Sequence, residues 1–543
     1  MQVRRRRRED RLSKLSDATL GRILSFLPAK EAGRASALSS RWRNVYAGVD
    51  AITLEQPESP IPDYEDYGSW SYGRPVDPNP KPPFGTTVTA ALLARHLVPT
   101  APAPPLRVLR VALNHYRRED ASTVDHWVSY ALKHAAPAPV GLELDLRLRR
   151  VPVCSRPYSL CCASSSRKRS RSTDADEEEE VNSRPRRMSV SDDDESSCWP
   201  QYTVPRMLFS SAALRSLSLG PCKLSPPDTI SLPSLEALLL VRVTDCERNV
   251  QRLVYACPRL ADLTLEACGM VTALYLHGNR RLRKLALRCC HSLVVAEVND
   301  KLQTLEYRGA VPDTSLLALR SGGRWKPTSC MIDICGKEVS SEKELAKLGK
   351  FLQLLASTKH LHLRSARLGC GMEHDALAKL LPAFTRLLHL ELTGLLPHDD
   401  GDDGDAAVAA VSRILQHAPN LKVLSLSLDT DPSKEGLHER RSWHDCKDSE
   451  FVRAHQLRCN KYEVLAAPAV TIPCLRKRVR EINFAHYHGG RAQRTLAKFL
   501  LCNAPLLKTL YCGIVRGELW IQDMLRDEIR GWAMNTPENC IFD

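Results

Sequence analysis

The chain has 543 residues, a formal net charge of +14 at neutral pH and 19 cysteines. This length is enough for several domains or for one extended array of repeats. No stretch approaches the roughly 18 uninterrupted apolar residues of a membrane-spanning helix, and no apolar run follows the basic N-terminus, so we expect neither a membrane span nor a secretory signal peptide.

Part of the excess positive charge lies in an N-terminal basic arm, residues 1–11, which contains six arginines and two acidic residues. Clustered basic side chains can neutralise nucleic-acid phosphates. No zinc-finger, RRM or KH pattern accompanies the arm, so a nucleic-acid partner is not expected, and a nuclear address or a solvated arm explains it more simply. We expect the protein in the nucleus and the cytoplasm, mainly in the nucleus.

Three short helices are predicted within residues 12–50. Asp17 follows a serine and precedes a segment with apolar residues at helical spacing, which Pro28 ends. These apolar residues are Leu20, Ile23, Leu24 and Leu27. The stretches AGRASALSS and RWRNVYAGV predict two more helices. A unit of about 40 residues is near the lower limit for independent folding, so another surface must cover its apolar face.

Three polar segments interrupt the remaining sequence. Residues 51–87 are rich in Pro, Gly, Asp and Tyr and indicate a Pro-rich linker. Residues 163–198 carry seven basic and ten acidic side chains and almost no large apolar ones. Such a segment cannot offset the entropy of ordering its residues, so we expect a disordered charged insertion. The acidic, glycine-containing residues 398–405 predict a surface loop.

A leucine motif recurs outside these segments. Residues 257–268 follow the pattern C-x-x-L-x-x-L-x-L-x-x-C, and the early copies of its central L-x-x-L-x-L are spaced by 21, 25, 22 and 20 residues. This spacing is typical of leucine-rich repeats. Clear copies start at Leu214, Leu235, Leu260, Leu282, Leu387 and Leu421, and degenerate copies start at Leu106, Leu302 and Leu507. The repeat is poorly legible in residues 311–357 and 430–474.

Amphipathic helical segments such as VDHWVSYALKHA and AAVAAVSRILQHAP precede several of the motifs. The repeating unit is therefore helix, turn and strand, and strands joined in this way run parallel. We predict an α/β fold in which the N-terminal three-helix unit is followed by a curved leucine-rich-repeat solenoid with an inner parallel sheet and outer helices. The first units occupy residues 88–162, an array with loop insertions occupies 199–474, and terminal units occupy 475–543.

Side chains should alternate between the two faces of each strand. Leu263 and Leu265 then point into the core, and Cys268 packs in the turn that leaves the strand. The intervening positions face the concave surface and vary between repeats, for example His389, Glu391 and the serines of neighbouring strands. We take the following as candidate target-facing residues: Asp262, Thr264, Glu266, Lys284, Arg288, Glu306 and Arg308. The alternative at each position is a merely solvated side chain.

The cysteines favour structural thiols over a disulfide framework or a metal site. Zinc sites usually show two short-spaced Cys or His pairs, and here the nearest patterns are Cys161-Cys162, Cys289-Cys290 and His486-x-His488. P-loop, G-x-S-x-G, H-E-x-x-H and protein-kinase motifs are missing from the sequence. We therefore expect no metal, no cofactor and no catalytic residues, and hence a protein that is not an enzyme.

Residues 15–50 resemble an F-box, particularly the plant form. The residues that carry the resemblance are Leu15, Asp17, Leu20, Ile23, Leu24, Ser25, Phe26, Leu27, Pro28, Leu38, Ser39, Arg41, Trp42 and Arg43. The sequence departs from the family at Ser16, where Pro is usual. The resemblance implies docking on a Skp-type adaptor, and it carries over Leu15, Leu20, Ile23, Leu24, Leu27 and Pro28 as adaptor contacts. Some of these leucines must instead pack the three helices against one another.

The rest of the chain is similar to plant F-box proteins with leucine-rich repeats, and residues 475–543 resemble the FBD-type region that closes many such arrays. The resemblance implies a substrate-recognition subunit of an SCF-type E3 ubiquitin ligase. The adaptor would join a cullin scaffold with a RING subunit, and the repeats would hold an unknown target protein. Two alternatives stay open: a nuclear scaffold associated with nucleic acid, and an F-box protein that acts outside the ligase.

Overall fold

The protein is described here by a computed structural model. It describes residues 14–57, 83–96, 103–114, 116–149, 154, 156, 200–319, 325–369, 371–372, 374–396, 405–428, 457, 465, 470–535 and 537–543. The predicted disordered insertion, residues 163–198, and most of the acidic loop predicted at 398–405 lie outside these residues. Among the helices in the described segments, none combines the length and the apolar composition that a bilayer crossing requires.

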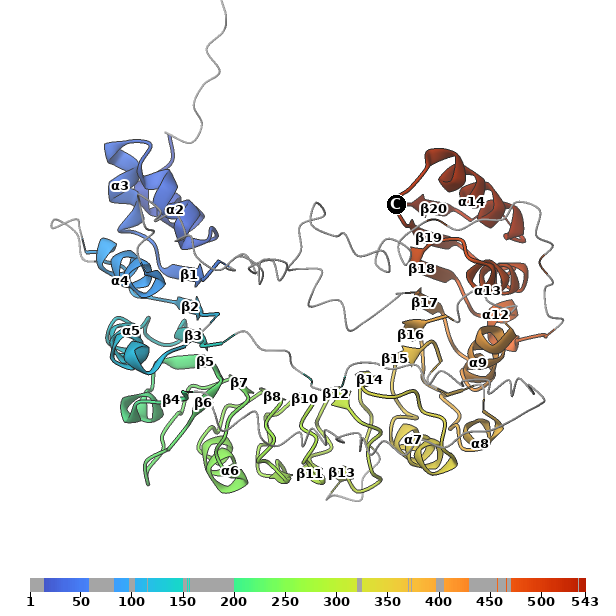
Figure 1. Ribbon diagram of the computed structural model, residues 1–543, viewed down its shortest axis with the longest axis horizontal. Helices are drawn as coiled ribbons and strands as arrows, with labels where there is room; N and C mark the ends of the chain where they lie inside the picture. Colours follow the sequence, from blue (N-terminus) through green and yellow to red (C-terminus); the bar gives the residue numbers. More distant parts are fainter. Residues whose placement is uncertain are drawn as a thin grey trace, which may run out of the picture.

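A single 15-stranded parallel sheet runs through the molecule and lines the inside of a horseshoe (Figure 1). The strands of this sheet follow one another in sequence order, and the strands that are missing from the numbering belong to two smaller sheets. The strands are β1 (Ala51–Glu55), β2 (Val108–Ala112), β3 (Leu142–Arg147), β5 (Leu214–Gly220), β7 (Ala237–Val241), β8 (Asp262–Glu266), β10 (Lys284–Arg288), β12 (Thr304–Gly309), β14 (Ser329–Ile334), β15 (His360–Arg367), β16 (His389–Leu395), β17 (Val423–Ser427), β18 (Glu481–Tyr487), β19 (Thr509–Ile514) and β20 (Asn539–Phe542). The predicted solenoid with an inner parallel sheet is confirmed.

One row of residues in register holds the sheet together, with one member from each strand. The members are Ile52, Leu109, Leu144, Leu217, Leu238, Leu263, Leu285, Leu305, Cys330, Leu361, Leu390, Leu424, Ile482, Leu510 and Cys540. Every member except Cys540, on the edge strand, is buried. The leucine offsets of the sequence therefore do place one apolar side chain of each repeat in a shared core. The poorly legible residues 311–357 contribute β14 and continue the row.

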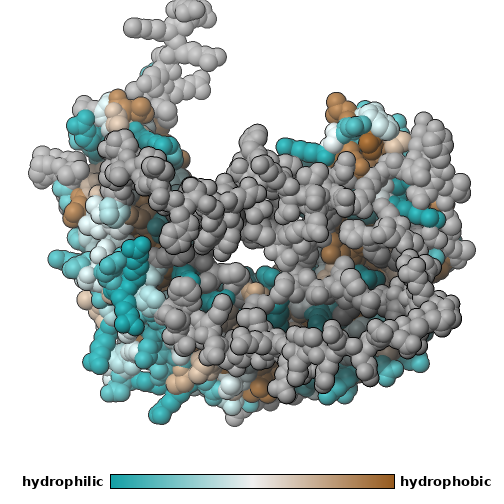
Figure 2. Space-filling model, viewed as in Figure 1, coloured by the Kyte–Doolittle hydropathy of each residue, from teal (hydrophilic) through white to brown (hydrophobic). Residues whose placement is uncertain are grey.

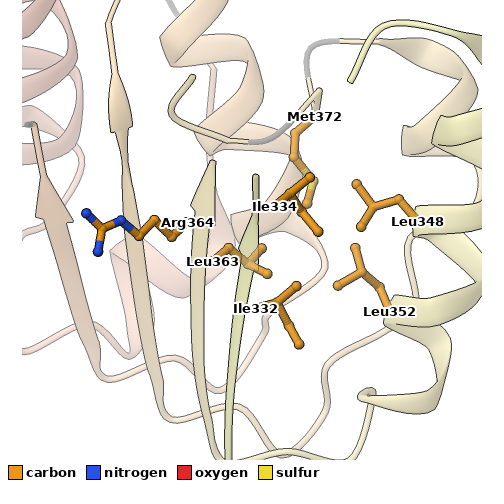
Figure 3. A pocket seen from close by; sticks show the side chains of 7 residues that line it. All are labelled: Ile332, Ile334, Leu348, Leu352, Leu363, Arg364 and Met372. Carbon is orange, nitrogen blue, oxygen red and sulfur yellow. The ribbon is translucent and has the colours of Figure 1, made fainter. Parts of the chain in front are cut away.

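Helices cover the convex side of both arms of the horseshoe (Figure 1). They are α4 (Phe84–Ala94), α5 (Ala121–Lys133), α6 (Glu247–Tyr255), α7 (Glu342–Leu354), α8 (Asp375–Ala378), α9 (Asp405–Gln416), α12 (Pro473–Lys477), α13 (Arg491–Cys502) and α14 (Leu519–Trp532). Figure 3 shows how α7 packs: its Leu348 and Leu352 face Ile332 on β14 and Leu363 on β15 and leave no space large enough for a water molecule. In that view Arg364 points to the opposite face of the sheet.

The centre of the convex side departs from the prediction of outer helices. There the return segments form a second parallel sheet of β9 (Ala273–Tyr275), β11 (Val295–Val298) and β13 (Leu317–Leu319). The inner strands β8, β10 and β12 begin at residues 262, 284 and 304, so each repeat has about 20 residues and too little chain for a strand, two turns and a helix. Repeats with helices are longer, as between β14 and β15, which begin at 329 and 360.

Three helices form the N-terminal bundle: α1 (Asp17–Leu24), α2 (Ala29–Ser36) and α3 (Ser40–Tyr46). The expected linker at residues 51–87 is wrong at both ends, because β1 already belongs to the sheet and α4 begins at Phe84. Both α2 and α4 contact β1, so the bundle caps the N-terminal end of the array. A shallow groove of about 270 Å³ runs between α2 and α4.

Polar contacts fix the bundle to the array. Asp50, which follows α3, forms a two-pronged ion pair with Arg107, and its backbone N–H donates to Ser25 Oγ at 3.2 Å. Arg95 at the end of α4 is fully buried, and its Nε donates to the Val49 carbonyl at 2.9 Å. A buried guanidinium is stable because its donors are satisfied. The junction between the bundle and the sheet is therefore as well packed as the repeats themselves.

Leu285→Ala should lower the free energy of unfolding by about 2–5 kcal/mol, because it opens a cavity in the buried row. Urea denaturation followed by circular dichroism measures this. The control is Lys284→Ala on the same strand, whose half-exposed ammonium pairs with Asp262 at 3.4 Å and should contribute less than about 1 kcal/mol. Equal losses for the two variants would contradict the assignment of the buried row.

Candidate functional site

The N-terminal bundle divides the six expected adaptor contacts into two groups. Leu20 and Leu24 are buried and pack the bundle's own core, so their assignment as adaptor contacts is wrong. Leu15 is half-buried against the same core. Ile23, Leu27 and Pro28 are exposed. This division arises because α1 packs one face against α3. The side chains on that face fill the core and cannot contact a partner at the same time.

Two further apolar side chains are more exposed than Ile23 and Leu27. Phe26 is 78% exposed and Leu38 is 75% exposed, against about 40% for Ile23 and Leu27. Figure 2 shows hydrophobic surface over the helices of the bundle. Exposed apolar residues of this size on one small unit indicate a docking surface. We call Ile23, Phe26, Leu27, Pro28 and Leu38 the bundle surface. Both Phe26 and Leu38 were visible in the sequence as motif positions, but nothing there showed their exposure.

Local hydrogen bonds hold α1 in the orientation that exposes this surface. Ser16 caps α1 by accepting a hydrogen bond from the Thr19 backbone N–H at 3.3 Å, so Ser at this position starts the helix as an N-cap. Asp17 in the first turn pairs with Arg41 Nε of α3 at 2.8 Å. The guanidinium of Arg41 also donates to the Leu15 carbonyl. The substitution of the usual Pro is therefore compatible with a well-defined helix start.

The second candidate surface is the concave face of β8, β10 and β12. The register brings the seven candidate target-facing residues to neighbouring positions on this face, as expected. They pair mainly with one another and with β14. Arg288 lies at the centre and donates hydrogen bonds to Glu266 at 3.1 Å and to both carboxylate oxygens of Glu306 at 2.5 and 3.0 Å; these two carboxylates raise its pKa, the hydrogen bonds to Glu306 most strongly. Lys284 lies 3.4 Å from Asp262, and Arg308 lies 3.4 Å from Asp333.

This pairing corrects the prediction for two residues. Thr264 and Glu266 are buried and cannot form part of an accessible surface as they stand. Ala286 at the next position of the same row is also buried. The outward positions therefore form a cross-strand charge network in the middle of the array, and the more exposed members, Asp262 and Lys284, lie at its margin. Whether a target contacts these residues stays a prediction.

A polar cluster that the sequence showed only in part lies further along, on β15 to β18. His362 accepts from or donates to Thr393 Oγ1 at 2.9 Å, and His389 does so with Ser425 Oγ at 3.1 Å. Asn483 Nδ2 donates to the same serine oxygen at 3.1 Å. His389 and Glu391 were predicted to face outward, whereas His362 in HLHL was assigned only to a strand. The cluster offers hydrogen-bonding groups rather than the paired charges of β8 to β12.

Most buried cysteines are structural thiols, as expected. Cys257 Sγ donates to the Leu253 carbonyl at 3.1 Å, and burial raises its pKa to about 12, so the thiol stays protonated. Cys268 packs in the turn after β8, where its Sγ lies 3.5 Å from the Leu240 carbonyl. A different arrangement occurs elsewhere in the described residues, where Cys154, Cys289, His291 and Cys335 converge so that their ligand atoms all lie within 4.8 Å of one another. Sequence spacing missed this group, because its members come from three separate segments.

Family models match two parts of the chain. Residues 12–45 match the F-box domain, and residues 192–313 match the leucine-rich repeats of the FBD-associated F-box protein At5g56370. The first match coincides with the three-helix bundle and its exposed apolar residues. The second covers β5 to β12, the part of the sheet with the clearest leucine row.

The chain thus combines an F-box with leucine-rich repeats and is similar to plant FBD-associated F-box proteins. It is 21% identical to the FBD-associated F-box protein At5g60610 of Arabidopsis thaliana over 513 residues, which is 92% of this chain and 98% of the relative. It is 26% identical to the putative F-box protein At3g44060 of the same plant over 46% of this chain and 43% of that one. A 54-residue segment is 48% identical to the F-box/LRR-repeat protein At2g42720 of Arabidopsis thaliana, covering 9% and 12% of the two chains.

Arg288→Met should destabilise this F-box protein by about 1–3 kcal/mol in urea denaturation, because it leaves two mostly buried carboxylates without their shared cation. Adding Glu266→Gln and Glu306→Gln to that variant should recover much of the loss. The control Lys284→Met removes a more exposed ion pair and should cost less than about 1 kcal/mol. Equal losses for Arg288→Met and Lys284→Met would contradict a central role for Arg288.

The stability of the array should fall as the pH falls below the ordinary histidine pKa of 6.5. Burial, followed by the smaller effect of Arg364, lowers the pKa of His362 despite the opposing charge of Glu391. The folded state therefore favours the neutral ring, and its contribution is complete above pH 6.5 and is lost as the pH drops through the lowered value. His362→Gln should flatten this dependence in urea denaturation at several pH values, whereas His126→Gln, at an exposed position of α5, should leave it unchanged.

Proposed function

We propose that this protein is the substrate-recognition subunit of an SCF-type ubiquitin ligase. F-box domains generally bind Skp-type adaptors, and F-box proteins with leucine-rich repeats are generally non-catalytic adaptors. In this assignment the bundle surface docks the adaptor, which links the chain to a cullin scaffold with a RING subunit. The array then holds a target protein close to the ubiquitin-charged enzyme, and the chain itself supplies proximity rather than catalysis.

The observation that carries the proposal is the exposure of the bundle surface on an otherwise well-packed bundle. Leu20, Leu24 and Val45 complete the internal core, so the exposed side chains are not needed to fold the unit. Burying a large apolar side chain on association is worth roughly 1.5–3 kcal/mol, so two or three such contacts give a useful interface. The bundle contacts the array through α2 and β1, whereas the side chains of the bundle surface stay exposed and available to a partner.

The array supports target binding through its concave face. The charge network of β8 to β12 and the polar cluster of β15 to β18 give two chemically different regions on one continuous sheet. A target that competes for the paired charges must replace internal ion pairs, which favours partners with matched charges over unspecific ones. The same pairing gives no support to a nucleic-acid interface there, because Arg288 and Arg308 already face carboxylates.

Phe26→Asp and Leu38→Asp should each weaken binding of a purified plant Skp-type adaptor by at least about 30-fold, since a central apolar contact is worth about 2 kcal/mol or more. Isothermal titration with the full chain measures the affinity. Both residues are exposed, so circular dichroism and the unfolding midpoint should match the parent protein. Leu24→Asp is unsuitable, because a buried carboxylate in the bundle core would unfold the bundle.

The matched control is Leu93→Asp, an equally drastic change at an apolar residue of α4 that is 59% exposed and lies outside the bundle. Its affinity for the adaptor should equal that of the parent. If the parent chain bound no Skp-type adaptor, or if both bundle variants bound like the parent, the proposed function would be wrong. Cullin co-purification from plant extract with the parent, and its loss with Phe26→Asp, distinguishes ligase assembly from adaptor binding outside the ligase.

A further inference from the structure

Four potential metal ligands meet at the edge of the sheet where the strands end. Cys289 and His291 follow β10, Cys335 follows β14, and Cys154 comes from the segment after β3. Between β10 and β14 lies β12, and both cysteines flank its end: the Cys289 backbone N–H donates to the Arg308 carbonyl at 2.5 Å, and the Cys335 backbone N–H donates to the Gly309 carbonyl at 2.8 Å. Parallel strands thus gather the carboxyl-terminal residues of two repeats at one point.

The distances fit one tetrahedral ion. Zinc–sulfur bonds of about 2.3 Å and zinc–nitrogen bonds of about 2.0–2.1 Å give a tetrahedron whose edges are roughly 3.5–3.8 Å long. Cys154 Sγ lies 3.4 Å from His291 Nε2, and all four ligand atoms lie within 4.8 Å of one another. The three cysteines are free thiols, at separations longer than a disulfide bond. A disulfide would join only two of the three cysteines and would not account for the proximity of the third thiol and the imidazole.

The surroundings of Cys154 suit a metal-bound thiolate. The backbone N–H of Arg156 donates to Cys154 Sγ at 3.3 Å, the type of outer contact that orients thiolate ligands. The turn at Cys289 has a left-handed backbone (φ 53°), as do Arg242 and Ala267 after β7 and β8. The turn is therefore a general property of these repeats, and at β10 it carries a cysteine.

We propose that Cys154, Cys289, His291 and Cys335 form a structural Cys₃His zinc site. Thiolate and imidazole donors in a tetrahedral arrangement favour zinc over the harder cations, and four protein ligands close the coordination sphere. Binding releases one proton for each thiol that is protonated beforehand and leaves three thiolates on a divalent ion, a net charge of −1. Half-buried Cys154 and exposed His291 provide access for the ion, while Cys289 and Cys335 are buried.

Such a site would fasten two distant parts of the array together. The chain from Arg147 to Cys154 is seven residues long and reaches about 24 Å when extended, and four strand-to-strand steps of about 4.8 Å separate β3 from β10. The zinc ion would therefore pin the segment that leaves β3 to the middle of the horseshoe, just before residues 163–198.

The test is the zinc content of the full chain, purified with reductant, dialysed against a weak chelator and measured by mass spectrometry. We expect about one zinc ion per chain. Cys154→Ser and His291→Ala should each lose most of the zinc, because each variant removes one of the four ligands. Neither residue lies in a strand or belongs to the leucine row, so the fold should tolerate both changes. The control Cys246→Ser removes an exposed thiol outside the cluster and should keep the zinc. Circular dichroism spectra of Cys154→Ser and His291→Ala that match the spectrum of the parent exclude misfolding as the cause.

Cobalt(II) added to the metal-free parent should give the visible absorption of tetrahedral thiolate coordination, and Cys154→Ser should not. Titration of thiols in denaturant without reductant should find every cysteine reduced. A parent chain that retains no zinc and shows no such cobalt spectrum would overturn the proposal, as would a disulfide between Cys154 and either of the other two cysteines. Zinc that is lost equally from Cys246→Ser and Cys154→Ser would show scattered adventitious binding and would overturn it as well.

Discussion

The leucine row is the constraint on which the rest of the structure depends. Each strand contributes one buried residue at the same register, so inner strands must stack at about 4.8 Å. Helices on the convex side need about 8–10 Å each, and this mismatch bends both arms. In the centre β9, β11 and β13 have the same spacing as the inner strands, and the array runs nearly straight there (Figure 1). The lengths of the repeats therefore set the shape of the horseshoe.

The same register determines which polar side chains meet on the inner face of the sheet. Residues between the buried leucines stand opposite one another on neighbouring strands, so acidic and basic side chains at equivalent positions meet as pairs. Pairing removes free charge from the middle of the array and leaves hydrogen-bonding groups on β15 to β18. A target would thus meet a surface whose specificity depends on displacing internal partners as much as on new contacts.

Much of the fold could be predicted because leucine offsets report the register directly. The strands β1, β14, β18 and β20 were not predicted, since their row residues are Ile52, Cys330, Ile482 and Cys540 in place of leucine. Leu24 is buried and Phe26 is exposed because of the way the helices of the bundle pack against one another. The apolar spacing within one helix does not reveal this packing. The convergence of Cys154 with His291, 137 positions away, depends on the closure of the whole array. Local sequence spacing therefore predicts elements well and long-range sites poorly.

The fusion of the bundle to the sheet has a mechanical consequence. β1 follows α3 after four residues, and Asp50 ties this junction to Arg107 of the next repeat, so the bundle and the repeats are joined by a short, anchored connection. A target bound to the array would then have a fixed orientation relative to the bundle and to any scaffold attached there. Which of its lysines came within range would then be decided by the arc of the array, and a repeat gained or lost would redirect modification.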